Sequence, residues 1–180
     1  MKERSLSLQP FSSDGPLPGL TITTTLLRRS TNTLAIRYAL LGDLEDLRVP
    51  IAADTPVRKD GLWEETCFEL FLALPGSPRY WEINLSPAGH WNVYRFAAYR
   101  QGMRQESAFS SLSFSVGSRP GSLSIGLELD LRSIVGSDRP MEIGVSAVVK
   151  HRSGDVSYWA LTHGGPQADF HRRDGFIVEL

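Results

Sequence analysis

The segment Trp63–Ala97 decides the fold, and it reads WEETCFELFLALPGSPRYWEINLSPAGHWNVYRFA. It holds three runs rich in strand-forming residues, Thr66–Leu74, Tyr80–Ser86 and Trp91–Tyr99. The runs are separated by PGSPR and SPAGH, whose proline and glycine residues are typical of tight turns. The segment therefore predicts a meander of three neighbouring antiparallel strands.

The rest of the chain shows the same alternation of apolar and polar residues, interrupted by proline and glycine. Further strands are expected at Ser5–Pro10, Leu20–Arg28, Thr33–Leu41, Ser111–Val116, Ser122–Leu129, Met141–Lys150, Ser157–Leu161 and Phe176–Leu180. About ten short strands with turn signals between them predict an all-β fold, an antiparallel β-sandwich or barrel. No repeat or linker interrupts the pattern, so residues 1–180 are interpreted as a single domain.

Composition excludes several classes of protein. With 19 basic and 20 acidic residues, the chain has no global positive field to attract nucleic acid or an anionic membrane.

Cys67 is the only cysteine, so it cannot form an intrachain disulfide, and its place in an apolar strand predicts a small core residue. The start, MKERSLSLQPFSSDG, lacks an apolar signal core, and no apolar run approaches ~18 residues. A cytoplasmic, soluble protein is expected.

The central meander has two different faces, because successive side chains of a strand point in opposite directions. Leu70 and Ile83 belong to fully apolar sets and are assigned to the core, together with Trp81. The opposite set contains Glu69, Glu82 and Asn84. If Tyr94 and Phe96 also point to the core, Arg95 joins this polar set.

Two interpretations of the polar face stay open. One is a solvated outer face that carries a cross-strand Glu–Arg pair. The other is a concave groove that binds a sugar-like ligand, because carboxylate, amide and guanidinium groups bond hydroxyls while Trp and Tyr stack on sugar rings.

Two blocks of sequence resemble the DOMON-like domains, relatives of the family 9 carbohydrate-binding modules. They are LWEETCFELFLA…YWEINLSPAGHWNVYRFAAYRQGM and YWALTHGGPQADFHRRDGFIVEL. The variety is similar to the bacterial stand-alone domains found with proteins related to UDP-N-acetylmuramate dehydrogenase. The resemblance implies a jelly-roll-like β-sandwich that binds a carbohydrate without catalysis and without a cofactor. It further implies that Trp63 is a clamp aromatic, that Glu69 and Arg95 contact the ligand, and that Trp159 is a second aromatic.

The predicted site therefore comprises Trp63, Glu69, Glu82, Asn84, Arg95 and Trp159, with no metal and no catalytic residue. Alternatives are a module for protein interaction or homo-oligomerisation, and a haem-binding domain of the DOMON type that would use Met103 with His163 or His171. A glycosidase-like use of Glu69 and Glu82 is the enzymatic alternative. The segment His163–His171 lacks metal-ligand spacing and is interpreted as a structural loop anchored by Phe170.

Overall fold

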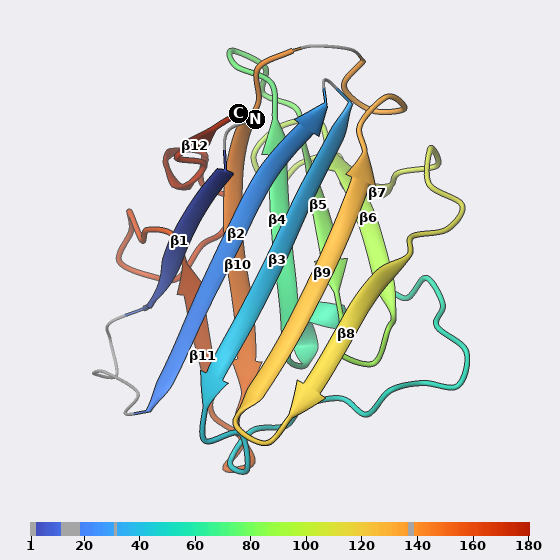
Figure 1. Cartoon of the computed structure of the whole chain (residues 1–180). Coiled ribbons are helices and arrows are strands. Elements are labelled where there is room, and N and C mark those ends of the chain that lie inside the picture. The colour runs from blue at the N-terminus through green and yellow to red at the C-terminus, as the bar shows by residue number, and fades with distance from the viewer. Residues whose placement is uncertain (1–2, 12–18, 31, 137–138) are drawn as a thin grey trace.

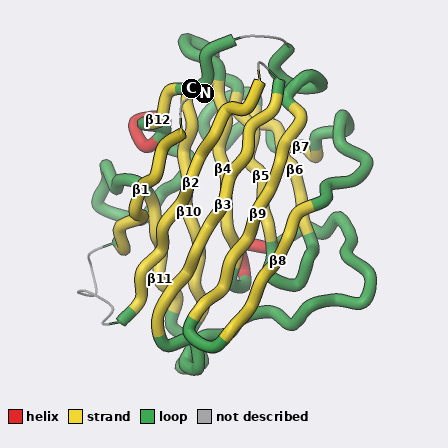
Figure 2. Tube along the Cα trace, viewed as in Figure 1, coloured by secondary structure: helices red, strands yellow, loops and turns green. Residues whose placement is uncertain are grey.

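The computed structural model describes residues 3–11, 19–30, 32–136 and 139–180; residues 1–2 and 12–18 of the amino-terminal stretch considered above lie outside it. Almost every regular element is a strand (Figure 2). The strands are β1 (Glu3–Pro10), β2 (Leu20–Ser30), β3 (Thr33–Gly42), β4 (Cys67–Ala73), β5 (Tyr80–Leu85), β6 (Trp91–Phe96), β7 (Arg104–Gln105), β8 (Phe114–Arg119), β9 (Ser122–Asp130), β10 (Glu142–Lys150), β11 (Val156–Ala160) and β12 (Val178–Glu179). Two 3-10 turns, η2 (Leu62–Glu64) and η3 (Arg173–Gly175), complete the description.

The strands form two antiparallel layers that face one another (Figure 1). One layer has the order β8-β9-β3-β2-β1, and the other has the order β7-β6-β5-β4-β10-β11. Strand β1 joins them, because Glu3–Leu8 pair with β2 whereas Gln9 and Pro10 pair with β11. The predicted all-β antiparallel sandwich is confirmed. Among the described residues, no helix is long and apolar enough to cross a membrane.

The main core fills the space between the layers. Alternate residues of each strand supply it, among them Leu70 and Ile83 of the central meander, as the sequence predicted. Tyr38 enters from the opposite layer and donates a hydrogen bond from its hydroxyl to the Glu69 carbonyl oxygen at 2.7 Å. Burial of so many aliphatic side chains is the dominant stabilising contribution to such a sandwich.

A second apolar cluster lies on the outer face of the β4–β5–β6 layer. It contains Phe71, Ala73, Tyr80, Tyr94, Phe96 and Phe176. Phe176 comes from the carboxy-terminal segment, and it can approach the sheet because Gly144 has no Cβ. A Cβ there would lie 2.7 Å from the Phe176 ring. The outer face is therefore covered by the last part of the chain and is not the solvated face of the first interpretation.

The structure corrects one assignment of faces. In β6, Trp91 and Val93 point into the main core, while Tyr94 and Phe96 point to the outer face. The condition on which Arg95 would join the polar set, that Tyr94 and Phe96 point to the inter-sheet core, is therefore not met. Alternation could not decide between the two sets of β6, because both contain aromatic residues. The short strand β7 was not predicted.

Candidate functional site

Polar side chains form a continuous row across four strands on the outer face. Strand register places Ser146 beside Glu69, Glu69 beside Asn84, and Asn84 beside Asn92. In the next row Glu82 lies between Phe71 and Tyr94. Glu69 and Glu82 are diagonal neighbours, which lie ~7–8 Å apart in a sheet, a separation that long side chains can bridge.

Both carboxyl groups are withdrawn from solvent. Glu69 is 3% exposed and Glu82 is 4% exposed. Glu69 Oε2 accepts a hydrogen bond from Ser146 Oγ at 3.0 Å, and Glu82 Oε1 accepts one from Asn84 Nδ2 at 2.8 Å. Burial, followed by the proximity of Glu82, raises the pKa of Glu69 to about 8. Burial also raises the pKa of Glu82 to about 7. Near neutral pH the pair therefore retains protons that exposed glutamates would have lost.

A cavity of about 380 Å³ opens above these carboxyls. Six elements or loops line it: η2, β4, β5, the end of β6 with the turn that follows, β10–β11, and the segment before η3. The lining residues are Trp63, Glu69, Glu82, Phe96, Arg100, Met103, Val148, Tyr158, Ala168, Phe170 and His171. Glutamates form its floor, and aromatic rings form much of its wall. This mixture of apolar walls and a few polar groups is typical of small-molecule sites.

A chain of hydrogen bonds fixes His171 beside the floor. The Arg100 backbone N–H donates to the Tyr80 hydroxyl at 3.2 Å, so the Tyr80 O–H is directed to His171 Nδ1, 2.8 Å away. Nδ1 is then an acceptor, and the ring proton is on Nε2. Nε2 lies 3.7 Å from Glu82 Oε2. Burial, with the charge of Arg100, lowers the pKa of His171 to about 4, so the imidazole is neutral.

Arg100 and Asp169 form an ion pair at the rim. Arg100 Nη2 lies 2.8 Å from Asp169 Oδ1, and Asp169 also accepts hydrogen bonds from the Tyr99 hydroxyl and the His171 backbone N–H. Arg100 has a φ of 51°, and it is the one residue other than glycine with positive φ among the described residues. Unusual backbone conformations of this kind are concentrated at functional sites.

Trp63 is held at the opposite rim by a network below it. Its ring contacts the Tyr94 ring edge-on, with centroids 5.8 Å apart. The Tyr94 hydroxyl donates to Asp60 Oδ1 at 2.6 Å, and Gln105 Nε2 and Asn92 Nδ2 donate to the same oxygen. These hydrogen bonds, first that of Tyr94, lower the pKa of Asp60. The Trp63 side chain stays 39% exposed and is available to a ligand.

The structure brings four of the six predicted site residues together. Trp63, Glu69 and Glu82 line the cavity, and Asn84 lies directly beside the two carboxyls. The placement of Arg95 on this face is wrong. It pairs in register with Trp81, points to the other side of the sheet, and has Nε 3.9 Å from Glu106 Oε2.

The placement of Trp159 at the site is also wrong. Its ring belongs to the main core, is 3% exposed, and donates from Nε1 to Ser157 Oγ at 3.0 Å. The neighbouring residue Tyr158 points to the cavity instead. Tyr158 and Trp159 are neighbours in β11 and therefore point to opposite faces of the sheet. An assignment that is wrong by one residue in a strand thus selects the wrong face.

Most residues at the rim of the cavity were not predicted from the sequence. Arg100, Tyr158 and the ring of Phe96 carried no recognisable site signal. Phe170 and His171 were interpreted as parts of a structural loop. Phe170 packs on Tyr158 with 6.1 Å between ring centroids, as an anchor would, whereas the His171 imidazole bonds the Tyr80 hydroxyl and lines the cavity. The segment that carries Phe170 and His171 is fixed in its conformation by these contacts, and it also covers the cavity.

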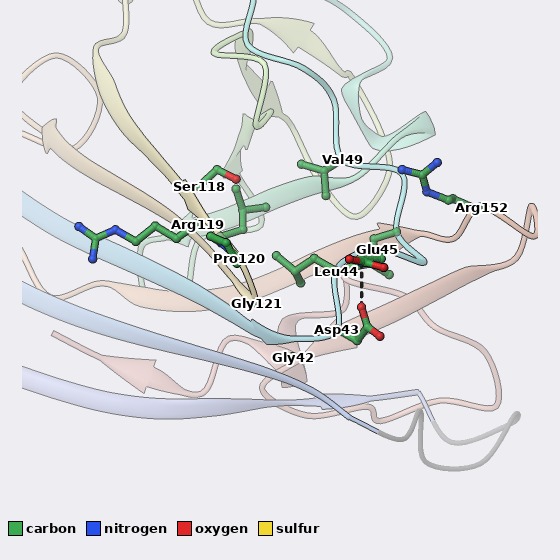
Figure 3. Close-up of a pocket in the computed structure, with 12 residues that line it drawn as sticks. Gly42, Asp43, Leu44, Glu45, Val49, Ser118, Arg119, Pro120, Gly121 and Arg152 are labelled. Carbon is green, nitrogen blue, oxygen red and sulfur yellow. Dashed lines mark hydrogen bonds between the residues drawn. The ribbon is translucent and has the colours of Figure 1, made fainter.

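A second depression lies between the β8–β9 hairpin and the segment after β3 (Figure 3). Its volume is about 640 Å³, and its charged lining residues, Asp43, Glu45, Arg119 and Arg152, are all exposed. Asp43 Oδ1 accepts the Glu45 backbone N–H at 3.0 Å, a local turn contact drawn in Figure 3. Because no buried polar group faces this depression, it is a weaker candidate than the cavity above Glu69 and Glu82.

Comparisons with known proteins agree on the fold. No family model matches the chain, and no curated protein matches it. A candidate carbohydrate-binding protein from Bacteroides uniformis superposes with a TM-score of 0.69 at 14% identity, covering 96% of this chain and 83% of that one. A family 9 carbohydrate-binding module from Caldicellulosiruptor kristjanssonii, solved in complex with glucose, gives a TM-score of 0.50 at 10% identity, covering 86% and 72%. The chain thus has the fold seen in these carbohydrate-binding structures.

Proposed function

We propose that this protein binds a sugar or glycan fragment without catalysing a reaction on it. The observation that carries the proposal is the cavity of about 380 Å³ with two buried carboxyls as its floor and exposed Trp63 at its rim. A ring-shaped polar ligand would stack its apolar face on an aromatic side chain and direct hydroxyls to the carboxyls and to Arg100. A protonated carboxyl both donates and accepts, as a hydroxyl does.

The fold comparisons support this function in general terms, since one similar structure is a candidate carbohydrate-binding protein and another holds glucose. We also propose, from the sequence resemblance, that the domain is of the DOMON-like type. Separately from that resemblance, we propose that it acts in the cytoplasm. A glycosidase role fits less well. A catalytic pair needs one carboxyl ionised and one protonated, whereas burial raises the pKa of both Glu69 and Glu82.

The cavity does not fit a haem. Met103 and His171 do line the same cavity, as the haem alternative requires. However, His171 Nδ1 bonds the Tyr80 hydroxyl, and Nε2 faces Glu82. Two buried carboxyls therefore occupy the floor where an apolar porphyrin would pack, and burial of unpaired carboxyls against such a ring is unfavourable.

A thermal-shift and glycan-array screen of the purified protein tests the proposal. We expect at least one sugar to raise the melting temperature, and Trp63→Ala to abolish that shift while the unliganded protein stays folded. Val116→Ala is the matched control, because Val116 is an exposed apolar residue on the other layer, in β8. Absence of any shift across the sugars would refute sugar binding and favour an interaction or self-association module, to be tested by pull-down and sedimentation.

A further inference from the structure

We infer that the cavity is selective for a sugar that carries a primary ammonium group, held over Glu69 and Glu82. This inference rests on the proposed sugar-binding function and adds the class of ligand. It follows from two features of the floor: too few hydrogen-bond donors for its acceptors, and no positive charge to balance its carboxyls.

The floor has unused acceptor atoms. Ser146 and Asn84 each donate one hydrogen bond, to Glu69 Oε2 and Glu82 Oε1 respectively. In the described part of the chain, Glu69 Oε1 and Glu82 Oε2 have no donor within hydrogen-bond distance. Asn84 Oδ1 is buried and likewise lacks a partner there. Of these three atoms only Asn84 Oδ1 is a fully buried acceptor without a partner, which is rare and costs free energy. Glu69 and Glu82 line the cavity, so a ligand with N–H donors can reach their free oxygens.

The floor also lacks a cation. His171 is the nearest basic group, and the Tyr80 hydroxyl fixes it as the neutral tautomer. Arg100 faces the cavity but is paired with Asp169. Cys67, Tyr80 and Tyr94 on this face are neutral, since burial raises the pKa of each, and the Lys150 ammonium bonds the Glu64 carbonyl oxygen and pairs with Glu65. Burial is the main cause of the raised pKa values of Glu69 and Glu82, and the charge of Glu82 adds to it for Glu69; the charge of Arg100 lowers both values without offsetting burial.

An ammonium group supplies both missing properties, because it brings three N–H donors and one positive charge. The walls are compatible with it. Trp63, Phe96, Tyr158 and Phe170 present aromatic rings around the floor, and ring faces attract cations. The same rings can stack on the sugar ring that carries the ammonium group. The cavity volume of about 380 Å³ is at the small end for ligand sites, which favours a single sugar unit.

The test is a calorimetric titration of the full chain with glucosamine, glucose and N-acetylglucosamine at neutral pH. The three differ at one ring position, which carries an ammonium, a hydroxyl or a neutral acetamide. We expect glucosamine to bind about tenfold more tightly than either neutral sugar, as a buried charge-assisted contact implies. Equal affinity for glucosamine and glucose would overturn this inference and leave sugar binding intact. Failure of all three, with no other sugar binding in the screen above, would refute the proposed function itself.

Two variants locate the ammonium group. Glu69→Gln and Glu82→Gln should each reduce the preference for glucosamine to about twofold or less, since each replaces a carboxyl that can ionise opposite the bound ammonium group with an amide that cannot. Glu128→Gln removes the same charge from an exposed ion pair with Arg29 on the other layer and should leave the preference unchanged. A preference that survives in both floor variants would contradict the assignment. The comparison of sugars on the unmodified protein remains decisive if a variant does not fold.

Discussion

The buried carboxyls predict that the free energy of unfolding falls as pH rises above about 5, and the substitution Glu69→Gln tests this prediction. The pKa of Glu69 rises from 4.5 to about 8 on folding, because the group leaves water and approaches Glu82. Folding therefore takes up a proton between these two pH values. The free energy of unfolding falls as pH rises through this window, since the unfolded state binds fewer protons there.

The magnitude follows from the two pKa values. One pKa unit corresponds to ~1.4 kcal/mol, so Glu69 costs the folded state on the order of 3 kcal/mol at pH 7 and on the order of 5 kcal/mol above pH 8. Glutamine keeps the shape and can still accept from Ser146 Oγ, but it never ionises. We expect Glu69→Gln to stabilise the unliganded protein by roughly 4 kcal/mol at pH 8 and by less than about 1 kcal/mol at pH 5.

Differential scanning calorimetry at pH 5 and pH 8 measures this effect. For a chain of this size a gain of roughly 4 kcal/mol corresponds to a rise of about 8–16 °C in melting temperature. Glu128→Gln, which alters an exposed ion pair, should change stability by no more than about 0.5 kcal/mol at either pH. If Glu69→Gln lowers the melting temperature at pH 8, or changes it equally at both pH values, the carboxyl is stabilised as an anion and the reasoning is refuted.

Four further substitutions test the main core, the cavity and the segment that covers it. Trp159→Ala should lower the free energy of unfolding by about 3–5 kcal/mol in urea denaturation, because its ring lies in the main core. In calorimetric titration with whichever sugar binds, Arg95→Ala should leave affinity within about twofold, while Arg100→Ala should weaken it by about tenfold or more, because only Arg100 lines the cavity. Gly144→Ala should lower both the melting temperature and the sugar affinity, since its Cβ would lie 2.7 Å from the Phe176 ring that holds the covering segment in place.

The sequence was sufficient for the layers of the fold. Strands β4 and β5 have one fully apolar set each, so period-two alternation identified Leu70 and Ile83 as core and Glu69 as outer. Strand β6 has aromatic residues in both sets, and there the pattern alone could not choose. Register with β5 decides it, because Val93 pairs with Ile83 in the core.

Only the floor of the candidate site could be predicted from the sequence. Its floor comes from two adjacent strands, so Glu69 and Glu82 could be placed side by side from local pattern. Its rim comes from segments distant in the sequence, including Arg100 and the covering loop that carries His171. Only the folded chain brings these together, and nothing in their local sequence marks them as neighbours of the carboxyls. The loop covers part of the polar outer face of the sheet, and the space left between them is the cavity.

A crystal structure of the protein with a sugar selected by the thermal-shift screen tests the central claim most directly. The account predicts the sugar in the cavity, with one ring face on Trp63 and polar groups within hydrogen-bond distance of Glu69 or Glu82. A sugar bound elsewhere, such as in the depression beside Asp43 and Arg119, with the cavity empty, would contradict it.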